Sequence, residues 1–377
     1  MTVAFQTDSI SPHQVPFAKM MVQHIGVKNF RYVFVQEQTA GRKQLGWKDL
    51  REAWMINGTT NKVEKYKWLQ GCDVLVTGER TKDVLSILES RVQEGKLSFY
   101  MSERWFKPPF GMLRLLSPRF LRMAWRMVRL MRQENGFYYL PIGKHAAEDM
   151  ARLVGLFRGD LRCLFSAPLI ECEKVPCGGV NGAEHCGTKK MFLWGYFVST
   201  GDCVKRQIHE PLRILWVGRM IKLKRVDDII KAVRVASEKR KVELTLIGSG
   251  PEELKLRRMS EGLPVKFEAP VSINRVRELM RQHDVYVFSS NGYDGWGAVV
   301  SEALSEGMRV VGSEAPGAPI TILPNECLYK EGDVKRLADL LTRDIPWVGI
   351  GTWTPENAAK SFMSLVERCK ARSSHHD

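Results

Sequence analysis

The chain has 377 residues, of which 44% are hydrophobic and 26% are charged. This composition fits a globular protein of about two domains and excludes a disordered, collagenous or disulfide-dense chain. The formal net charge of +15 predicts an anionic partner, such as a phosphorylated ligand, a nucleic acid or an acidic membrane surface. No apolar run is long enough to span a bilayer, the N-terminus lacks a signal-peptide pattern and the cysteines are scattered. We therefore expect a cytoplasmic protein with free thiols.

The first half of the chain alternates strand and helix patterns, which predicts a doubly wound α/β domain with a parallel sheet. The predicted strands are residues 2–6, 30–36, 72–77, 97–102 and 137–142. The predicted helices are residues 15–25, 81–93 and a segment that starts near Ala146. Residues 171–190 are polar and rich in glycine, so we interpret them as a loop.

The second half repeats the α/β pattern after a polar stretch at about 198–211. Its predicted strands are residues 212–217, 242–247, 265–268, 285–289 and 309–312, and its predicted helices are 227–236, 273–281 and one that starts near Ala298. We expect domains at 1–197 and 198–354, followed by a C-terminal helix and tail at 355–377. Thr354 and Pro355 are suited to start that helix. Its apolar face would consist of Ala358, Phe362, Leu365, Val366 and Cys369.

A basic loop directly follows the predicted strand that ends at Val217. It begins with Gly218 and Arg219 and reaches Lys224 five residues after the arginine. Parallel sheets bind ligands at the carboxyl ends of their strands, and arginine and lysine suit phosphate oxygens. The loop is therefore a candidate diphosphate site, although an ordinary basic surface loop would have the same composition.

A second glycine-rich loop, at residues 289–297, also follows a predicted strand and leads into the helix that starts near Ala298. The N-terminus of a helix favours anions. Asp294 in the loop and Glu302 in the helix supply carboxylates suited to sugar hydroxyls. A solvated loop before an ordinary helix is the alternative, and Trp296 between two glycines argues against it.

Three segments in this half resemble the donor domain of family 4 (group 1) glycosyltransferases: GRMIKLKRVDDIIKAV, LTLIGSGPEEL and DVYVFSSNGYDGWGAVVSEALSEGMRVVGS. The resemblance covers about residues 212–318. It implies the GT-B fold, in which two Rossmann-like domains face each other across a cleft and a C-terminal helix packs back on the N-terminal domain. It also implies retaining transfer from a nucleotide-diphosphate sugar as co-substrate, with no metal and no other cofactor. Asp294 departs from the family, which usually has glutamate there.

The resemblance also implies individual roles. Arg219 and Lys224 after Gly218 would bind the diphosphate, Asp294 the hydroxyls of the transferred sugar and Glu302 the ribose. The backbone of Gly297 and Ala298 would contact sugar and phosphate. The first half resembles the family more weakly. Its candidate acceptor or sugar contacts are His13, Glu103, Arg104 and His145, and an ordinary turn histidine is the alternative for His13.

Residues 119–132 predict a basic amphipathic helix. One face carries Arg119, Arg122, Arg126, Arg129 and Arg132 together with Trp125. The opposite face carries Phe120, Met123, Ala124, Met127, Val128 and Met131. This pattern suits an anionic membrane surface, whereas a core helix with a solvated basic face is the alternative. No nucleic-acid-binding pattern accompanies it, so we expect no nucleic-acid partner.

These features together predict a cytoplasmic glycosyltransferase of the hexosyltransferase type, peripheral on the inner face of the membrane. It would add a sugar to a glycan acceptor, expected to be lipid-linked, in surface polysaccharide or glycolipid synthesis. A GT-B nucleotide-sugar epimerase and a non-catalytic sugar-nucleotide-binding protein of an assembly complex remain alternatives. A zinc site at Cys172, Cys177, His185 and Cys186 is disfavoured because the spacing fits no common pattern.

Overall fold

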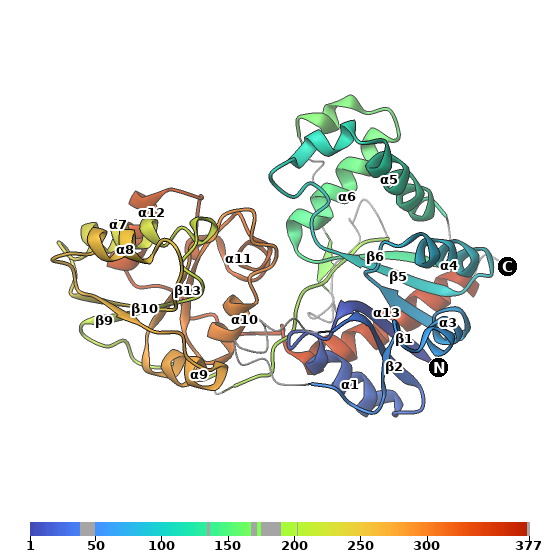
Figure 1. The fold of residues 1–377 in the computed structure, drawn as a ribbon, viewed down its shortest axis with the longest axis horizontal. Helices are drawn as coiled ribbons and strands as arrows, with labels where there is room; N and C mark the ends of the chain where they lie inside the picture. Colours follow the sequence, from blue (N-terminus) through green and yellow to red (C-terminus); the bar gives the residue numbers. More distant parts are fainter. Residues whose placement is uncertain (38–49, 134–135, 167–171, 175–189, 202, 375–377) are drawn as a thin grey trace. The chain divides into compact units, whose positions relative to one another are not determined.

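The computed structural model describes residues 1–37, 50–133, 136–166, 172–174, 190–201 and 203–374. These residues form two compact units (Figure 1). The first unit contains the described residues up to Phe197 together with the C-terminal segment from Thr354. The second unit contains the segment Val198–Trp353.

The first unit is built on a parallel six-stranded sheet with the order β3-β2-β1-β4-β5-β6. Its strands are β1 (Val3–Ser9), β2 (Phe30–Gln36), β3 (Met55–Asn57), β4 (Val74–Thr77), β5 (Leu97–Ser102) and β6 (Phe137–Pro141). The short strands β7 (Glu173–Lys174) and β8 (Phe192–Leu193) form a separate pair. The chain moves outward from β1 in one direction and then restarts at β4 in the other, which is the doubly wound arrangement.

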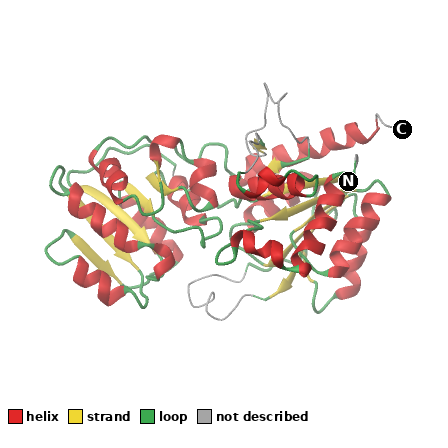
Figure 2. Ribbon diagram, turned by 90° about the horizontal axis from the view of Figure 1, so that it is seen from above, coloured by secondary structure: helices red, strands yellow, loops and turns green. Residues whose placement is uncertain are grey.

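Helices flank this sheet, as Figure 2 shows in red beside the yellow strands. They are α1 (Val15–Ile25), α3 (Lys62–Gly71), α4 (Lys82–Gln93), α5 (Pro118–Met131), α6 (Lys144–Leu156) and α13 (Pro355–Ser374), with the 3₁₀ helices η1 (Gly111–Leu116) and η2 (Leu161–Leu164). Helix α13 packs on α1, and the ring of Phe362 lies 5.9 Å from that of Phe17 and 5.3 Å from that of Phe99. The predicted return of the C-terminal helix to the N-terminal domain is confirmed.

The second unit repeats the plan, with the strand order β11-β10-β9-β12-β13-β14. Its strands are β9 (Leu212–Val217), β10 (Val242–Ile247), β11 (Val265–Glu268), β12 (Val285–Phe288), β13 (Arg309–Ser313) and β14 (Leu328–Tyr329). Its helices are α7 (Val226–Ala236), α8 (Glu253–Met259), α9 (Ile273–Gln282), α10 (Ala298–Ser305), α11 (Gly317–Ile322) and α12 (Val334–Thr342), with the short η4 (Lys222–Lys224) and η5 (Asn325–Cys327). Two Rossmann-like units were predicted, and both are present.

The elements that the sequence patterns missed include β3 and α3 in the first unit and α8, α11, α12 and β14 in the second. Only Lys65 and Leu69 of α3 are buried, so this helix lacks the apolar stripe that reveals a helix in a sequence. The Lys65 ammonium is buried because it pairs with the Glu79 carboxylate at 3.0 Å. A buried charge needs such a partner, and the partner is visible only in the folded chain.

Candidate functional site

The predicted donor-binding residues lie on two loops and one helix at a single edge of the second sheet. The loop that starts at Gly218 follows β9, and the loop at 289–297 follows β12 and leads into α10. Strands β9 and β12 are neighbours, and the strand order reverses between them. Open α/β sheets bind their ligands at such a switch point, at the carboxyl ends of the strands.

The two loops are joined by an ion pair. The Lys224 Nζ atom lies 2.5 Å from an Asp294 carboxylate oxygen, and both side chains are partly buried. Backbone contacts fix the same region: the Ser289 hydroxyl donates to the Lys224 carbonyl at 2.6 Å, and the Asn291 N–H donates to the Leu223 carbonyl at 2.9 Å. The structure thus brings together a cation and a carboxylate that are 70 residues apart in the chain.

The Gly218 loop rests on the turn that follows β10. A Cβ atom at Gly248 would overlap the carbonyl oxygen of Gly218, and the Met220 N–H donates to the Ser249 carbonyl at 2.8 Å. Glycine at position 248 therefore lets the two backbones meet. Arg219 lies on this supported loop with its side chain exposed, and within the described part of the chain it forms no ion pair. The turn's supporting role is a feature that the sequence did not indicate.

Gly297 is the N-cap of α10, and its conformation requires glycine. Its φ of 88° is left-handed, and a Cβ atom there would lie 2.5 Å from the Phe288 ring. The first N–H groups of α10, beginning at Ala298, have no acceptor within the helix. Trp296 beside them is buried against Trp353, with ring centroids 5.7 Å apart, so it anchors the loop.

Glu302 lies within α10, half-buried, on the same helix as the Gly297 cap. Burial raises the pKa of its carboxyl to about 6; the Arg277 guanidinium opposes this shift and the Glu306 carboxylate adds to it. Glu306 is fully buried and pairs with both Arg277 and Arg281. This cluster behind the site was not found in the sequence, because its members lie on separate helices, α9 and the end of α10.

The candidates of the first unit follow the ends of its strands. Glu103, just after β5, accepts a hydrogen bond from the Tyr196 hydroxyl at 2.9 Å and pairs with Lys107. The His13 ring lies 6.3 Å from the Tyr196 ring, and its carbonyl accepts from the Phe197 N–H at 2.8 Å. Tyr196 therefore links His13 to Glu103, and the sequence analysis had missed this residue.

Arg104 and His145 have partners on α6 instead. The Arg104 guanidinium lies 3.4 Å from Asp149, whose carboxylate also accepts the backbone N–H groups of Trp105 and Phe106 at 2.9 and 3.0 Å. The Nδ1 atom of His145 lies 3.0 Å from the Glu148 carboxylate. The ion pair of Arg104 with Asp149 thus belongs to a set of contacts that holds the loop after β5 on α6.

Arg80, which follows β4 at the switch point of the first sheet, is a further polar residue that the sequence analysis missed. Its Nε donates to the Tyr100 hydroxyl at 3.0 Å, and its guanidinium lies 4.9 Å from the centroid of the Trp105 ring. The position of Arg80 directly after a buried strand was the signal that could have found it.

The basic helix predicted at 119–132 exists as α5, but its apolar face is not available to a membrane. Phe120, Met127 and Val128 are buried in the core of the first unit. Two arginines are also engaged within the unit: Arg126 binds the Glu89 carboxylate at 2.7 and 2.8 Å, and Arg132 donates to the Phe157 carbonyl at 2.8 Å.

The exposed arginines of α5 are Arg119, Arg122 and Arg129. The Arg129 guanidinium lies 5.5 Å from the centroid of the exposed Trp125 ring. Three of the five arginines are thus exposed on this helix, and their contact with a membrane stays a prediction.

Of the four residues weighed as a zinc site, Cys177, His185 and Cys186 lie outside the described residues. Among the residues that are described, no group of three or more His, Cys, Asp or Glu side chains is arranged to hold a metal ion. In the same residues no helix combines the length and the apolarity needed to cross a bilayer.

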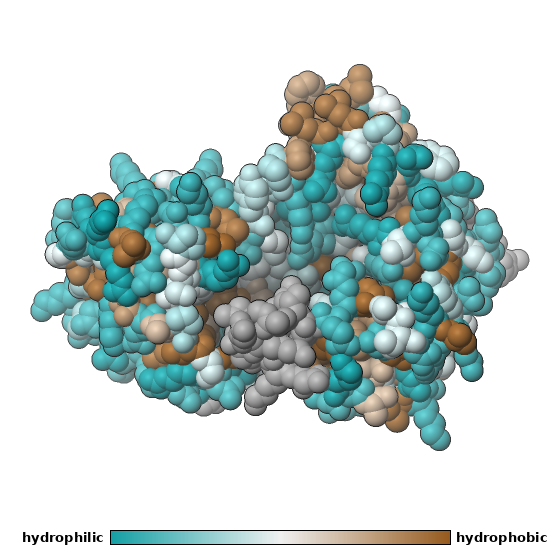
Figure 3. All heavy atoms as spheres, viewed as in Figure 1, coloured by the Kyte–Doolittle hydropathy of each residue, from teal (hydrophilic) through white to brown (hydrophobic). Residues whose placement is uncertain are grey.

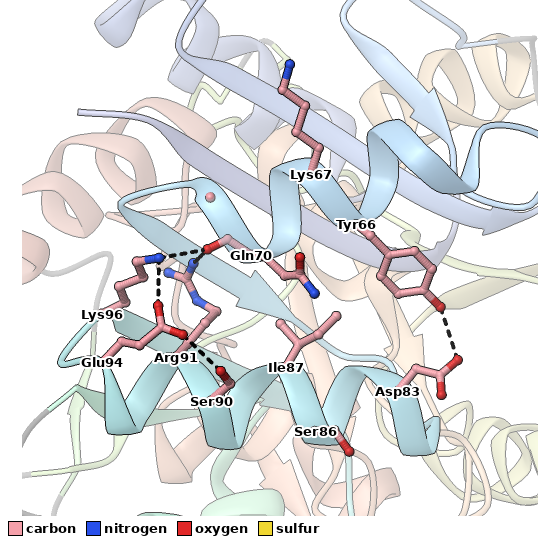
Figure 4. A pocket seen from close by; sticks show the side chains of 11 residues that line it. Tyr66, Lys67, Gln70, Asp83, Ser86, Ile87, Ser90, Arg91, Glu94 and Lys96 are labelled. Carbon is pink, nitrogen blue, oxygen red and sulfur yellow. Dashed lines mark hydrogen bonds and ion pairs between the residues drawn. The ribbon is translucent and has the colours of Figure 1, made fainter.

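A groove of about 850 Å³ between α3 and α4 is a different kind of feature (Figure 4). The Arg91 guanidinium beneath it donates to the carbonyls of Leu69, Gln70 and Cys72 at 3.1, 3.0 and 2.8 Å. These bonds satisfy the carboxyl end of α3. Arg91 and its acceptors lie just before β4 and β5, at the amino ends of the strands, so we interpret the arginine as structural.

Part of the second unit resembles known proteins in sequence. Residues 211–344 match the family model described as Glycosyl transferases group 1. A GDP-mannose-dependent monoacylated alpha-(1-6)-phosphatidylinositol monomannoside mannosyltransferase of Corynebacterium glutamicum is 31% identical over 134 residues, which are 33% of this chain and 35% of that protein. The amylovoran biosynthesis glycosyltransferase AmsK of Erwinia amylovora is 30% identical over 148 residues, 36% of each chain. The match thus spans about a third of these relatives.

Solved structures resemble the whole chain in fold. The lipopolysaccharide outer core galactosyltransferase WaaB superposes with a TM-score of 0.62 at 15% identity, covering 98% of this chain and 99% of the other. Anabaena HepE in complex with UDP superposes with a TM-score of 0.56 at 14% identity, covering 100% and 98%. The chain has the GT-B fold, and residues 211–344 of its second unit resemble the group 1 glycosyl transferases.

Proposed function

We propose that this protein is a retaining glycosyltransferase that moves a hexose from a nucleotide-diphosphate sugar to a glycan acceptor without a metal ion. The observation that carries the proposal is the Lys224–Asp294 pair at the switch point, beside the N-terminus of α10. A cation and a carboxylate pair there, and the first N–H groups of α10 follow a few residues after Asp294 in the chain. These are the groups that a diphosphate and a sugar require together.

The leaving diphosphate acquires charge as the sugar departs. Arg219 and Lys224 would neutralise that charge, and the N–H groups at Ala298 would add hydrogen bonds in place of a metal ion. The Lys224 ammonium has three donors, so it can contact a phosphate oxygen while it stays close to Asp294. Asp294 would accept hydrogen bonds from hydroxyls of the transferred sugar, and Glu302 from the ribose.

The proposed acceptor is lipid-linked and lies at an anionic membrane surface on its cytoplasmic side. The Corynebacterium glutamicum relative is named for a phosphatidylinositol mannoside, which supports a lipid-linked acceptor here. Arg119, Arg122 and Arg129 are exposed on α5 and would contribute attraction to anionic headgroups.

A thermal-unfolding screen with nucleotide-diphosphate sugars tests the proposal. A specific donor at a hundred times its Kd stabilises a protein by about 2.7 kcal/mol. The donor found in this way is then incubated with glycan acceptors and with EDTA, and the anomeric configuration of the product is read by NMR. A product with inverted anomeric configuration would overturn the retaining mechanism, and loss of activity with EDTA would overturn the metal independence. Donor binding with neither transfer nor donor hydrolysis would indicate a non-catalytic binder.

We expect Asp294→Asn to reduce turnover by about tenfold or more, with a smaller change in the KM for the donor. The charged hydrogen bonds of Asp294 to the reacting sugar would become neutral and weaker, and Lys224 would lose its partner. Asp294→Glu keeps the charge and should retain activity. Steady-state kinetics check this prediction, and a change confined to the donor KM would contradict the role given to Asp294.

The affinity for the donor should fall as pH drops through about 6. Burial raises the pKa of Glu302 to about 6, so the protonated form predominates below that pH and cannot accept both ribose hydroxyl bonds. If only the carboxylate form binds, the Kd rises about tenfold per pH unit below 6. Calorimetric titration with a nucleotide sugar at several pH values measures this dependence of the donor Kd on pH. Glu302→Gln should bind more weakly at neutral pH and lose the pH dependence; an unchanged pH profile in this variant would assign the titration to another group.

A further inference from the structure

An exposed apolar patch lies on the first unit, formed by η1 and η2 beside α5 and α6. Figure 3 shows apolar side chains gathered at the top of this unit, above the helices labelled α5 and α6 in Figure 1. The exposed side chains that define the patch are Phe110, Leu113, Leu116, Leu161, Leu164 and Phe165. Leu116 is 80% exposed and Phe165 is 90% exposed.

The geometry of η1 separates its apolar residues into two rows. A 3₁₀ helix has three residues per turn, so residues three apart lie above one another. Met112 and Leu115 form a row that packs on the core of the unit. Phe110, Leu113 and Leu116 form a second row that faces solvent. The inner row packs η1 on the core, whereas the outer row is largely exposed to solvent.

The short helix η2 repeats this division. Cys163 is buried against Gly155 of α6, and the Arg152 guanidinium donates to the Cys163 carbonyl at 3.0 Å. These contacts hold η2 on α6. Leu161 and Leu164, three residues apart, remain exposed beside Phe165. Two adjoining elements thus present large side chains outward, and such patches mark interaction surfaces.

The charged residues around the patch are mostly basic, which favours an anionic partner. Residues 107–132 contain seven lysine and arginine residues and no acidic residue. Arg158 lies just before η2 and Arg162 lies within it, where the Asp160 carboxylate pairs with Arg162 at 2.9 Å. Long basic side chains around protruding apolar ones complement a surface that is anionic outside and apolar beneath, which is the headgroup boundary of a bilayer.

We infer that the outer rows of η1 and η2 insert into an anionic lipid bilayer while Arg119, Arg122 and Arg129 contact its headgroups. This rests on the proposed function in one respect, because a lipid-linked acceptor gives the attachment its purpose. Here η1 and η2 supply the apolar contact that the buried face of α5 cannot supply. The patch is therefore a protruding docking surface formed by exposed side chains of two short helices, and it is not a ligand-binding groove.

Co-sedimentation of the full chain with vesicles of phosphatidylcholine, alone or mixed with phosphatidylglycerol, tests the inference. We expect the wild type to bind the mixed vesicles. The triple variant Leu113→Ser, Leu116→Ser, Phe165→Ser keeps every charge and should lose about tenfold or more of this partitioning. Its thermal unfolding should be unchanged because the three side chains are exposed. The variant Arg119→Gln, Arg122→Gln, Arg129→Gln should weaken binding chiefly at low salt.

The matched control is Val63→Ser with Leu254→Ser, which removes side chains that are 84% and 73% exposed outside the patch. It should bind vesicles like the wild type. Equal vesicle binding by the patch variant and the wild type, or no binding by the wild type, would overturn the inference. A wild type that forms a dimer and binds no vesicles, with a patch variant that is monomeric, would also overturn it. Turnover with a soluble acceptor is measured in parallel. Its absence alongside patch-dependent vesicle binding would overturn the proposed function and leave the inference standing.

Discussion

Lys224→Ala should reduce turnover by about a hundredfold, as should Arg219→Ala, if each side chain acts as one donor to the charge that develops on the leaving diphosphate. Both residues lie on the loop that follows β9, and the turn at Gly248 supports its start. Folding should change little, because Arg219 is exposed and a partly exposed ion pair contributes about 1 kcal/mol or less. Steady-state kinetics with the donor found in the screen measure the effect.

Lys222→Ala is the matched control for this prediction. Lys222 is an exposed lysine in the same short helix η4, two residues before Lys224. The Lys222→Ala substitution removes the same charge from the protein and leaves the Lys224–Asp294 ion pair in place. Its turnover should stay within about twofold of the wild type, since only a general electrostatic attraction is lost. Equal losses in Lys222→Ala and Lys224→Ala would mean that the loop acts through its overall charge and that no specific clamp exists.

Gly297→Ala should abolish detectable donor binding and lower stability by about 1–3 kcal/mol. Two independent obstacles meet at this residue. The backbone φ of 88° disfavours any side chain, and the new methyl group would lie 2.5 Å from the Phe288 ring. The start of α10 would have to move, which displaces the N–H groups that follow Gly297. Thermal unfolding and calorimetric titration with the donor measure the two effects.

Gly292→Ala provides the comparison within the same loop. A Cβ atom at Gly292 would meet no other atom within 4 Å, and its φ is not left-handed. The variant should therefore fold and bind the donor as the wild type does, or become slightly more stable through its less flexible unfolded chain. If Gly297→Ala bound the donor as well as Gly292→Ala does, the N-terminus of α10 would have no part in binding.

Much of the fold could be predicted from the sequence. The buried strands and amphipathic helices carry periodic apolar patterns, so β2, β5, β9, β10 and β11 have the predicted bounds. The C-terminal helix starts at Pro355 as predicted, and the five residues of its apolar face are buried. Strand β1 continues to Ser9, beyond the predicted end at Gln6, because pairing with β2 extends it past the apolar run. The apolar pattern of a sequence indicates which residues of a strand are buried, but it does not indicate how far the strand continues to pair with its neighbour.

The alternation of strands and helices, the two α/β units and the loops that follow β9 and β12 can be predicted from the sequence, because they depend on local periodicity and on glycine and charge at strand ends. Which side chains meet depends on the folded arrangement of the strands and helices. The strand order set β9 beside β12 and so joined Lys224 to Asp294. Packing of α5 buried its apolar face and left the outer rows of η1 and η2 exposed. These outcomes follow from contacts between residues far apart in the chain, which no local pattern encodes.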